Sequence, residues 1–68
     1  MINTTKIRER MAELGITQRT VADKLGLAAP TVSQKLNRLR PMDLEEAKKL
    51  AEILELDSSQ MSEYFFSA

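Results

Sequence analysis

Residues 17–37, TQRTVADKLGLAAPTVSQKLN, decide the fold of this chain. Within them the small residue Ala22 lies in the middle of one predicted helix, and Gly26 ends that helix. A small side chain lets a second helix cross at close range, and glycine readily adopts the left-handed conformation that commonly follows a helix C-terminus. Apolar residues recur at helical spacing on both sides of the glycine: Val21, Leu25, Val32 and Leu36. The stretch therefore predicts two short helices packed around a tight turn.

This spacing is typical of a helix-turn-helix, whose second helix turns its outer face toward duplex DNA. Two local signals support the interpretation. Thr17 is a favourable N-cap for the first helix. Pro30 is compatible with the second helix only in its first turn, which places that helix at about residues 29–37. An ordinary helical hairpin can show the same few residues by chance, so the interpretation also depends on the rest of the chain.

The composition excludes most classes of enzyme. The chain has 68 residues, with no cysteine and no histidine for zinc sites, disulfides or the usual nucleophile pairs. A single domain, residues 1–68, buries only about 60% of its unfolded surface and has little room for an active site. We expect no catalytic residue, metal, cofactor or small-molecule ligand. No apolar run approaches the roughly 20 residues of a membrane span, and the charged N-terminal region is unlike a signal peptide, so we expect a cytoplasmic protein.

Charge is unevenly distributed along the chain although the net charge is zero. Residues 1–40 contain eight basic and three acidic side chains, a net charge of +5, whereas residues 41–68 contain two basic and seven acidic side chains, a net charge of −5. A basic half that includes the helix-turn-helix suits a phosphate-rich surface, with the acidic half turned away. Charges on small domains also commonly do no more than face solvent, and charge alone leaves both interpretations open.

Three further helices are predicted around this pair, which gives an all-α fold. Residues suited to their ends are Asn3 or Thr4 with Gly15 for the first helix, Asp43 for the fourth, and Asp57 with Gln60, as a capping box, for the last. Apolar residues expected to face the core are Ile7, Met11 and Leu14 in the first helix, and Leu44, Ala47, Leu50, Ala51 and Leu54 in the fourth.

Base contacts are expected from the outer face of the second helix of the pair, at Ala29, Pro30, Ser33 and Gln34. The Gln34 amide can bond the N6 and N7 edge of adenine, and the Ser33 hydroxyl can bond several bases. Ala29 and Pro30 make no directional side-chain bonds but can pack on a thymine methyl. For Ser33 and Gln34 the simpler alternative is a solvated polar face.

Phosphate contacts are expected on both sides of this helix. The candidates are Gln18 and Arg19 at the start of the preceding helix, Asn37, Arg38 and Arg40 after the reading helix, and Arg10 on the first helix. Free backbone N–H groups at the start of a helix favour anions. Phosphate contacts hold register and give salt-dependent affinity without carrying sequence information. For at least one of the arginines we expect only a solubilising role.

These residues resemble the Cro and CI-type phage repressors, a helix-turn-helix family of small bacterial and phage regulators. The resemblance runs from Ile7 to about Phe65 and includes Thr17-Gln18, residues 22–26, residues 31–37, residues 44–54 and the closing residues 61–66. It implies a compact five-helix, lambda-repressor-like domain that binds operator DNA as a homodimer. It also implies a transcriptional repressor, with the base contacts named above and phosphate contacts from Gln18, Arg19, Asn37 and Arg38.

Two features depart from the family's pattern. Lys35 occupies a position that is often apolar, and we expect it at the edge of the domain. Ala29 and Pro30 stand where many members carry hydrogen-bonding side chains, so Gln34 would carry much of the direct readout and groove shape the rest.

The last residues hold every aromatic side chain of the chain: Tyr64, Phe65 and Phe66. A small domain has little room for all three, so we expect them to serve a dimer surface. Closure of the core by Phe65 and Met61 is the alternative.

A different class of function also stays open, in which an antitoxin-like or other interaction module binds a basic protein through its acidic fourth and fifth helices. An enzyme is the third possibility.

Overall fold

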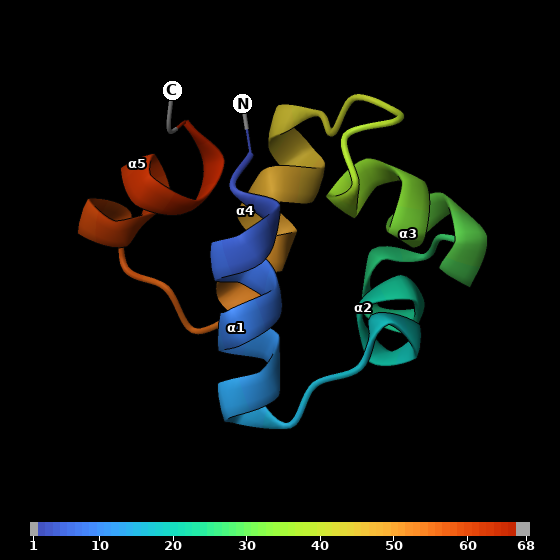
Figure 1. Ribbon diagram of the computed structural model, residues 1–68, viewed down its shortest axis with the longest axis horizontal. Helices are drawn as coiled ribbons and strands as arrows, with labels where there is room; N and C mark the ends of the chain where they lie inside the picture. Colours follow the sequence, from blue (N-terminus) through green and yellow to red (C-terminus); the bar gives the residue numbers. More distant parts are fainter. Residues whose placement is uncertain (1, 67–68) are drawn as a thin grey trace.

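The computed structural model describes residues 2–66, which form five α-helices and no β-strand. The helices are α1 (Thr4–Leu14), α2 (Gln18–Leu25), α3 (Ala29–Leu36), α4 (Leu44–Ile53) and α5 (Ser58–Phe65). In Figure 1, α1 stands in the middle with α4 behind it, α2 and α3 form a pair on one side, and α5 lies on the other. The predicted all-α, five-helix architecture is confirmed. None of these helices has the length and apolar character that a membrane span requires.

Side-chain caps set the start of four of the five helices. The N-caps of α1, α2, α4 and α5 are Asn3, Thr17, Asp43 and Asp57, and each side chain accepts a hydrogen bond from a first-turn backbone N–H. Both aspartates also form capping boxes with the side chain three positions further on. The N-cap of α3 is Ala28, which makes no side-chain bond, and Pro30 lies in the first turn as predicted.

The two glycines end α1 and α2 as the sequence predicts. Gly15 has φ 68° and Gly26 has φ 70°, the left-handed conformation that glycine adopts without strain. The next residues, Ile16 and Leu27, donate backbone hydrogen bonds back into the preceding helix and pack against the core. The chain therefore turns sharply from α2 into α3.

The core lies where the helices meet. Its buried side chains are Ile7, Met11, Val21, Ala22, Val32, Leu36, Ala47, Leu50, Ala51, Leu54 and Phe65. Two predictions are corrected. Leu44, expected in the inner stripe of α4, is 59% exposed, because it is the first residue of the helix and helical side chains lean toward the N-terminus, past the end of the core. Phe65, expected in a dimer surface, is 3% exposed and completes the core.

The last helix returns to the first. The backbone N–H of Asn3 donates to the carbonyl oxygen of Tyr64 at 2.8 Å. The Lys6 ammonium lies 2.9 Å from the Glu63 carboxylate and 5.4 Å from the centre of the Tyr64 ring. The hydrogen bond to Glu63, followed by its negative charge, raises the pKa of Lys6. Because this pair is exposed to solvent, it contributes little to stability.

Candidate nucleic-acid interface

α3 has a buried inner face and an accessible outer face. Val32 and Leu36 lie in the core. All four residues expected to contact bases lie away from that core: Ala29, Pro30 and Gln34 are exposed, and Ser33 is half-buried. Pro30 and Gln34 are four positions apart and therefore neighbours on one side of the helix. This is the shape of an element that can enter a major groove, which is wide enough for one α-helix.

Two side chains of α1 hold the end of α3. The Thr4 hydroxyl donates to the carbonyl oxygen of Leu36. Arg8 Nη2 donates to Asn37 Oδ1 at 3.1 Å, and Asn37 Nδ2 lies 3.5 Å from the Ser33 hydroxyl oxygen. Thr4 and Arg8 are four positions apart on α1, so they face the same neighbour. Arg8 is not among the predicted site residues, and only this spacing could have signalled it.

The segment after α3 carries three predicted phosphate contacts. Asn37, Arg38 and Arg40 are exposed and lie in the short segment that directly follows α3. Arg19, at the start of α2, is exposed as well. Gln18 is half-buried, and its Oε1 atom has no hydrogen-bond partner among the described residues. A phosphate oxygen only accepts hydrogen bonds, so it can meet the amide NH₂ of Gln18 and not this oxygen.

A comparison with protein families decides the class of this domain. The helix-turn-helix family matches residues 7–60, which is most of the chain. The chain belongs to the helix-turn-helix family. A comparison with curated proteins finds no match. The members of this family are DNA-binding transcription regulators, and α2, the turn at Gly26 and α3 are the helix-turn-helix of this one.

Arg10 lies apart from the helix-turn-helix surface at α3. Its Nε atom donates to the carbonyl oxygen of Leu54 at 2.9 Å, and its Nη1 atom lies 3.5 Å from a carboxylate oxygen of Glu13. The side chain is 26% exposed. Arg10 is thus engaged with the residue that follows α4, and the structure does not bring it to the group formed by Asn37, Arg38 and Arg40.

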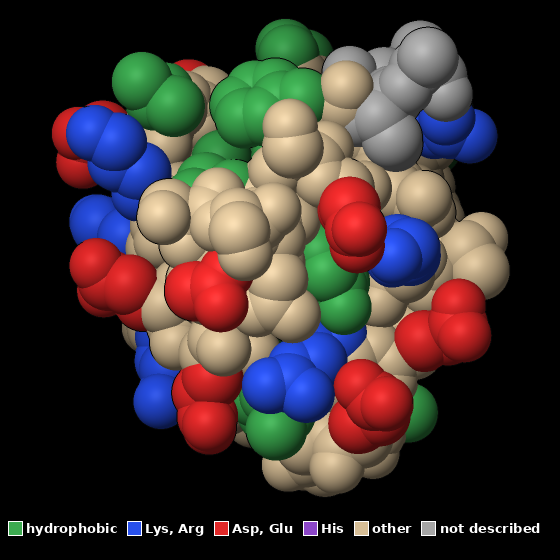
Figure 2. Space-filling model, turned by 90° about the vertical axis from the view of Figure 1, so that its left-hand side faces the viewer, with side chains coloured by type: hydrophobic (Ala, Val, Ile, Leu, Met, Phe, Trp, Pro, Cys, Tyr) green, Lys and Arg blue, Asp and Glu red, His purple; other side chains and the backbone are tan. Residues whose placement is uncertain are grey.

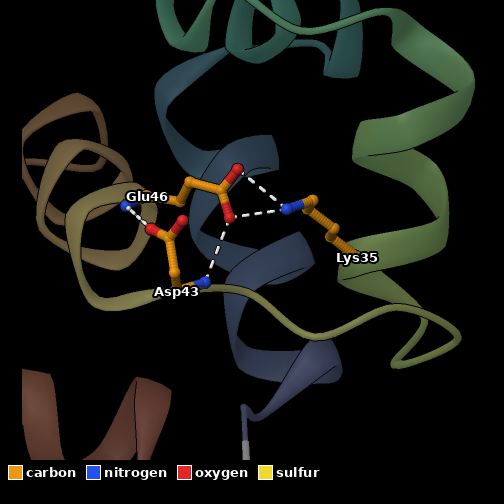
Figure 3. Close-up of polar contacts among 3 residues, drawn as sticks. All are labelled: Lys35, Asp43 and Glu46. Carbon is orange, nitrogen blue, oxygen red and sulfur yellow. Dashed lines mark hydrogen bonds and ion pairs between the residues drawn. The ribbon is translucent and has the colours of Figure 1, made fainter.

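Lys35 joins the helix-turn-helix to α4, although it was expected at the edge of the domain. Its ammonium lies 2.6 and 2.8 Å from the two carboxylate oxygens of Glu46 (Figure 3). The side chains of this pair are only 13% and 16% exposed. The position of Lys35 is corrected because Glu46, from a helix that follows in the sequence, supplies the charge that lets a lysine lie so deep.

Ion pairs within the fold offset part of the charge division along the chain. Lys6 and Lys35, from the basic half, pair with Glu63 and Glu46 from the acidic half. Figure 2 shows the side of the molecule that carries α5, where acidic and basic side chains are interspersed. This face of the helix-turn-helix domain is therefore not uniformly acidic.

Proposed function

We propose that this protein is a sequence-specific repressor that inserts α3 into the major groove of operator DNA. The observation that carries the proposal is the outer face of α3: it presents Pro30 and Gln34 to solvent, and the segment with Arg38 and Arg40 begins where the helix ends. Side chains on such a face can read base edges while neighbouring cations hold the phosphates.

In this proposal Gln34 is the main reader. Its amide NH₂ can donate to N7 of adenine while its amide oxygen accepts from the N6 amino group, a pattern that adenine presents in the major groove. Ser33 adds a hydroxyl one position earlier, although its partial burial limits its reach. Ala29 and Pro30 lie at the start of α3, and their carbon surfaces suit thymine methyl groups.

Phosphate contacts would flank this face. Gln18 and Arg19 lie at the start of α2, while Asn37, Arg38 and Arg40 follow α3. Arg8 takes a supporting role, because it occupies Asn37 Oδ1 and so orients the amide NH₂, of which one N–H is directed at Ser33 and the other can donate to a phosphate. We keep Arg10 out of this set because of its bond to Leu54.

We further propose that two copies bind the operator about a two-fold axis. Leu39 and Phe66 are 76% and 61% exposed, and both border a hollow of about 560 Å³ that Pro41 and Met42 also line. Leu39 is a protruding apolar side chain beside a mostly apolar hollow, whose lining also includes Lys35, Arg38 and Arg40. A protruding side chain next to a hollow is an arrangement that can be self-complementary about a two-fold axis. Tyr64 is half-buried and adjoins this region in the sequence. Half-sites one helical turn apart would then receive the two α3 helices.

Selection of bound sites from a random duplex pool tests the proposal. Recovery of a palindromic consensus, bound less tightly as salt rises, is the result expected of an operator-binding dimer. A reporter whose promoter overlaps that consensus should then be silenced by the protein. If no duplex binds at low salt and a basic protein is retained instead, the interaction-module alternative replaces the repressor.

A further inference from the structure

Lys35 and Glu46 form an ion pair that joins the two ends of the connection between α3 and α4. They lie 11 positions apart, one near the end of α3 and the other in the first turn of α4. Their side chains are 13% and 16% exposed, against 44% and 62% for Lys6 and Glu63. Of these two pairs, Lys35–Glu46 is much better shielded from water, which strengthens its attraction and raises the cost of breaking it.

Glu46 also belongs to the capping box of α4. Its Oε1 atom accepts from the backbone N–H of Asp43 at 3.0 Å, and Asp43 Oδ1 accepts from the backbone N–H of Glu46 at 2.8 Å. Figure 3 shows Lys35 entering this box from α3, so that one carboxylate serves both helices. The start of α4 is therefore fixed relative to the end of α3.

The segment spanned by this pair carries two of the three arginines that the proposed function assigns to phosphates. Lys35 directly follows Gln34 in α3, and the connection that includes Arg38 and Arg40 lies between Lys35 and Glu46. We infer that Lys35 and Glu46 are positioning residues, which hold the guanidinium groups of this segment in register with the reading face of α3. This inference rests on the proposed function.

A loss of register has a characteristic effect. Mobile cations can still meet the phosphates of any duplex, whereas base readout needs the helix and the phosphate contacts to fit at the same time. Breaking the pair should therefore weaken binding to the selected operator and leave binding to random duplex nearly unchanged. The ratio of the two dissociation constants is the quantity that reports the role of the pair.

Two variants with opposite charge changes separate positioning from simple electrostatics. Glu46→Gln removes the ion pair but keeps an oxygen that can accept from the Asp43 N–H, as Gln does in a capping box. Lys35→Met removes the ammonium and keeps an apolar stem. Lys35→Arg serves as the conservative variant, and Glu63→Gln, which breaks the exposed pair with Lys6, serves as the matched control.

The experiment measures the dissociation constants of the operator and of random duplex at one salt concentration, with thermal denaturation of every variant. Both Glu46→Gln and Lys35→Met should lower the preference for the operator by about fivefold or more, while Lys35→Arg and Glu63→Gln retain it. Two outcomes would overturn the inference. In the first, a variant shifts the dissociation constants of operator and random duplex by the same factor, in one direction for Glu46→Gln and in the other for Lys35→Met, which is a charge effect alone. In the second, both variants keep the full preference for the operator. If one variant does not fold, the other decides.

Failure of the proposed function gives a different result. In that case the unaltered protein itself would show no preference between the selected and random duplexes, before any variant is compared, and the inference would fall with it.

Discussion

The backbone N–H of Leu39 donates to the carbonyl oxygen of Gln34 at 2.8 Å, and this bond closes α3 around Arg38, whose φ is 63°. The N–H of Arg38 completes the motif with a bond of 3.2 Å to Lys35. The same pair of bonds ends α1, α2 and α4, around Gly15, Gly26 and Glu55. After α3 and α4, a charged residue thus stands where glycine stands after the first two helices.

Replacement of Arg38 should separate its backbone role from its charge. Because an L-residue is strained in the left-handed conformation, Arg38→Gly should have a free energy of unfolding about 1 kcal/mol higher than that of Arg38→Ala. Both variants lack the guanidinium, so both should bind operator and random duplex more weakly and to the same extent. Urea denaturation and duplex titration measure the two effects.

Glu55, with φ 57°, supplies the control for this prediction. Glu55→Gly and Glu55→Ala should differ in stability by a similar amount, about 1 kcal/mol, without a loss of DNA binding. If the Glu55 variants weaken duplex binding as much as the Arg38 variants do, the guanidinium of Arg38 has no special part in it.

Removal of the Gln34 amide should impair sequence recognition. Gln34→Ala is expected to weaken binding to the selected operator by about 1–3 kcal/mol and to change binding to random duplex little. The side chain is exposed, so the fold should be unaffected. Paired titrations of the two duplexes check this, and equal losses on both would exclude Gln34 as a base reader.

Removal of thymine methyl groups should reveal contacts of the first turn of α3. Ala29 and Pro30 have no side-chain hydrogen-bonding groups, so any readout by them is of shape and apolar surface. Replacing thymine by uracil at single operator positions should weaken binding about fourfold where a methyl is buried, from about 0.8 kcal/mol for a buried carbon group. Uniform tolerance of uracil across the operator would contradict the contact.

Leu39 should govern self-association. Leu39 follows the left-handed residue that ends α3. The residues in the same position after α1, α2 and α4 are Ile16, Leu27 and Leu56, and they pack against the core, whereas Leu39 is 76% exposed. Leu39→Ser should lower the dimer association constant by at least about tenfold, because each copy loses a buried leucine, and should leave stability unchanged. Sedimentation equilibrium with and without operator DNA measures the association.

Leu44→Ser is the matched control for that experiment. Leu44 is also an exposed leucine, at 59%, but it does not line the hollow beside Leu39. Dimerisation should survive this change. A protein that stays monomeric on its operator would contradict the two-fold arrangement altogether.

Much of the helix-turn-helix could be predicted because its signals act over a few residues. An N-cap such as Thr17 bonds an N–H three positions away, and Gly26 tolerates the left-handed turn whatever surrounds it. The outer face of α3 follows from helical spacing once Val32 and Leu36 are assigned to the core. The end of α3 was harder to read, since Arg38 gives no signal of a left-handed residue.

The number of helices, the N-caps Thr17, Asp43 and Asp57, the glycine ends of α1 and α2 and the outward face with Pro30 and Gln34 could be read from the sequence alone, because these depend on short-range hydrogen bonds and on residue spacing. The tertiary structure alone decided that Phe65 is buried and Leu44 exposed, and that Lys35 meets Glu46. It also brought Arg8 to Asn37, across 29 positions. Such contacts depend on which helix ends meet when the core closes, and no local pattern in the chain records that.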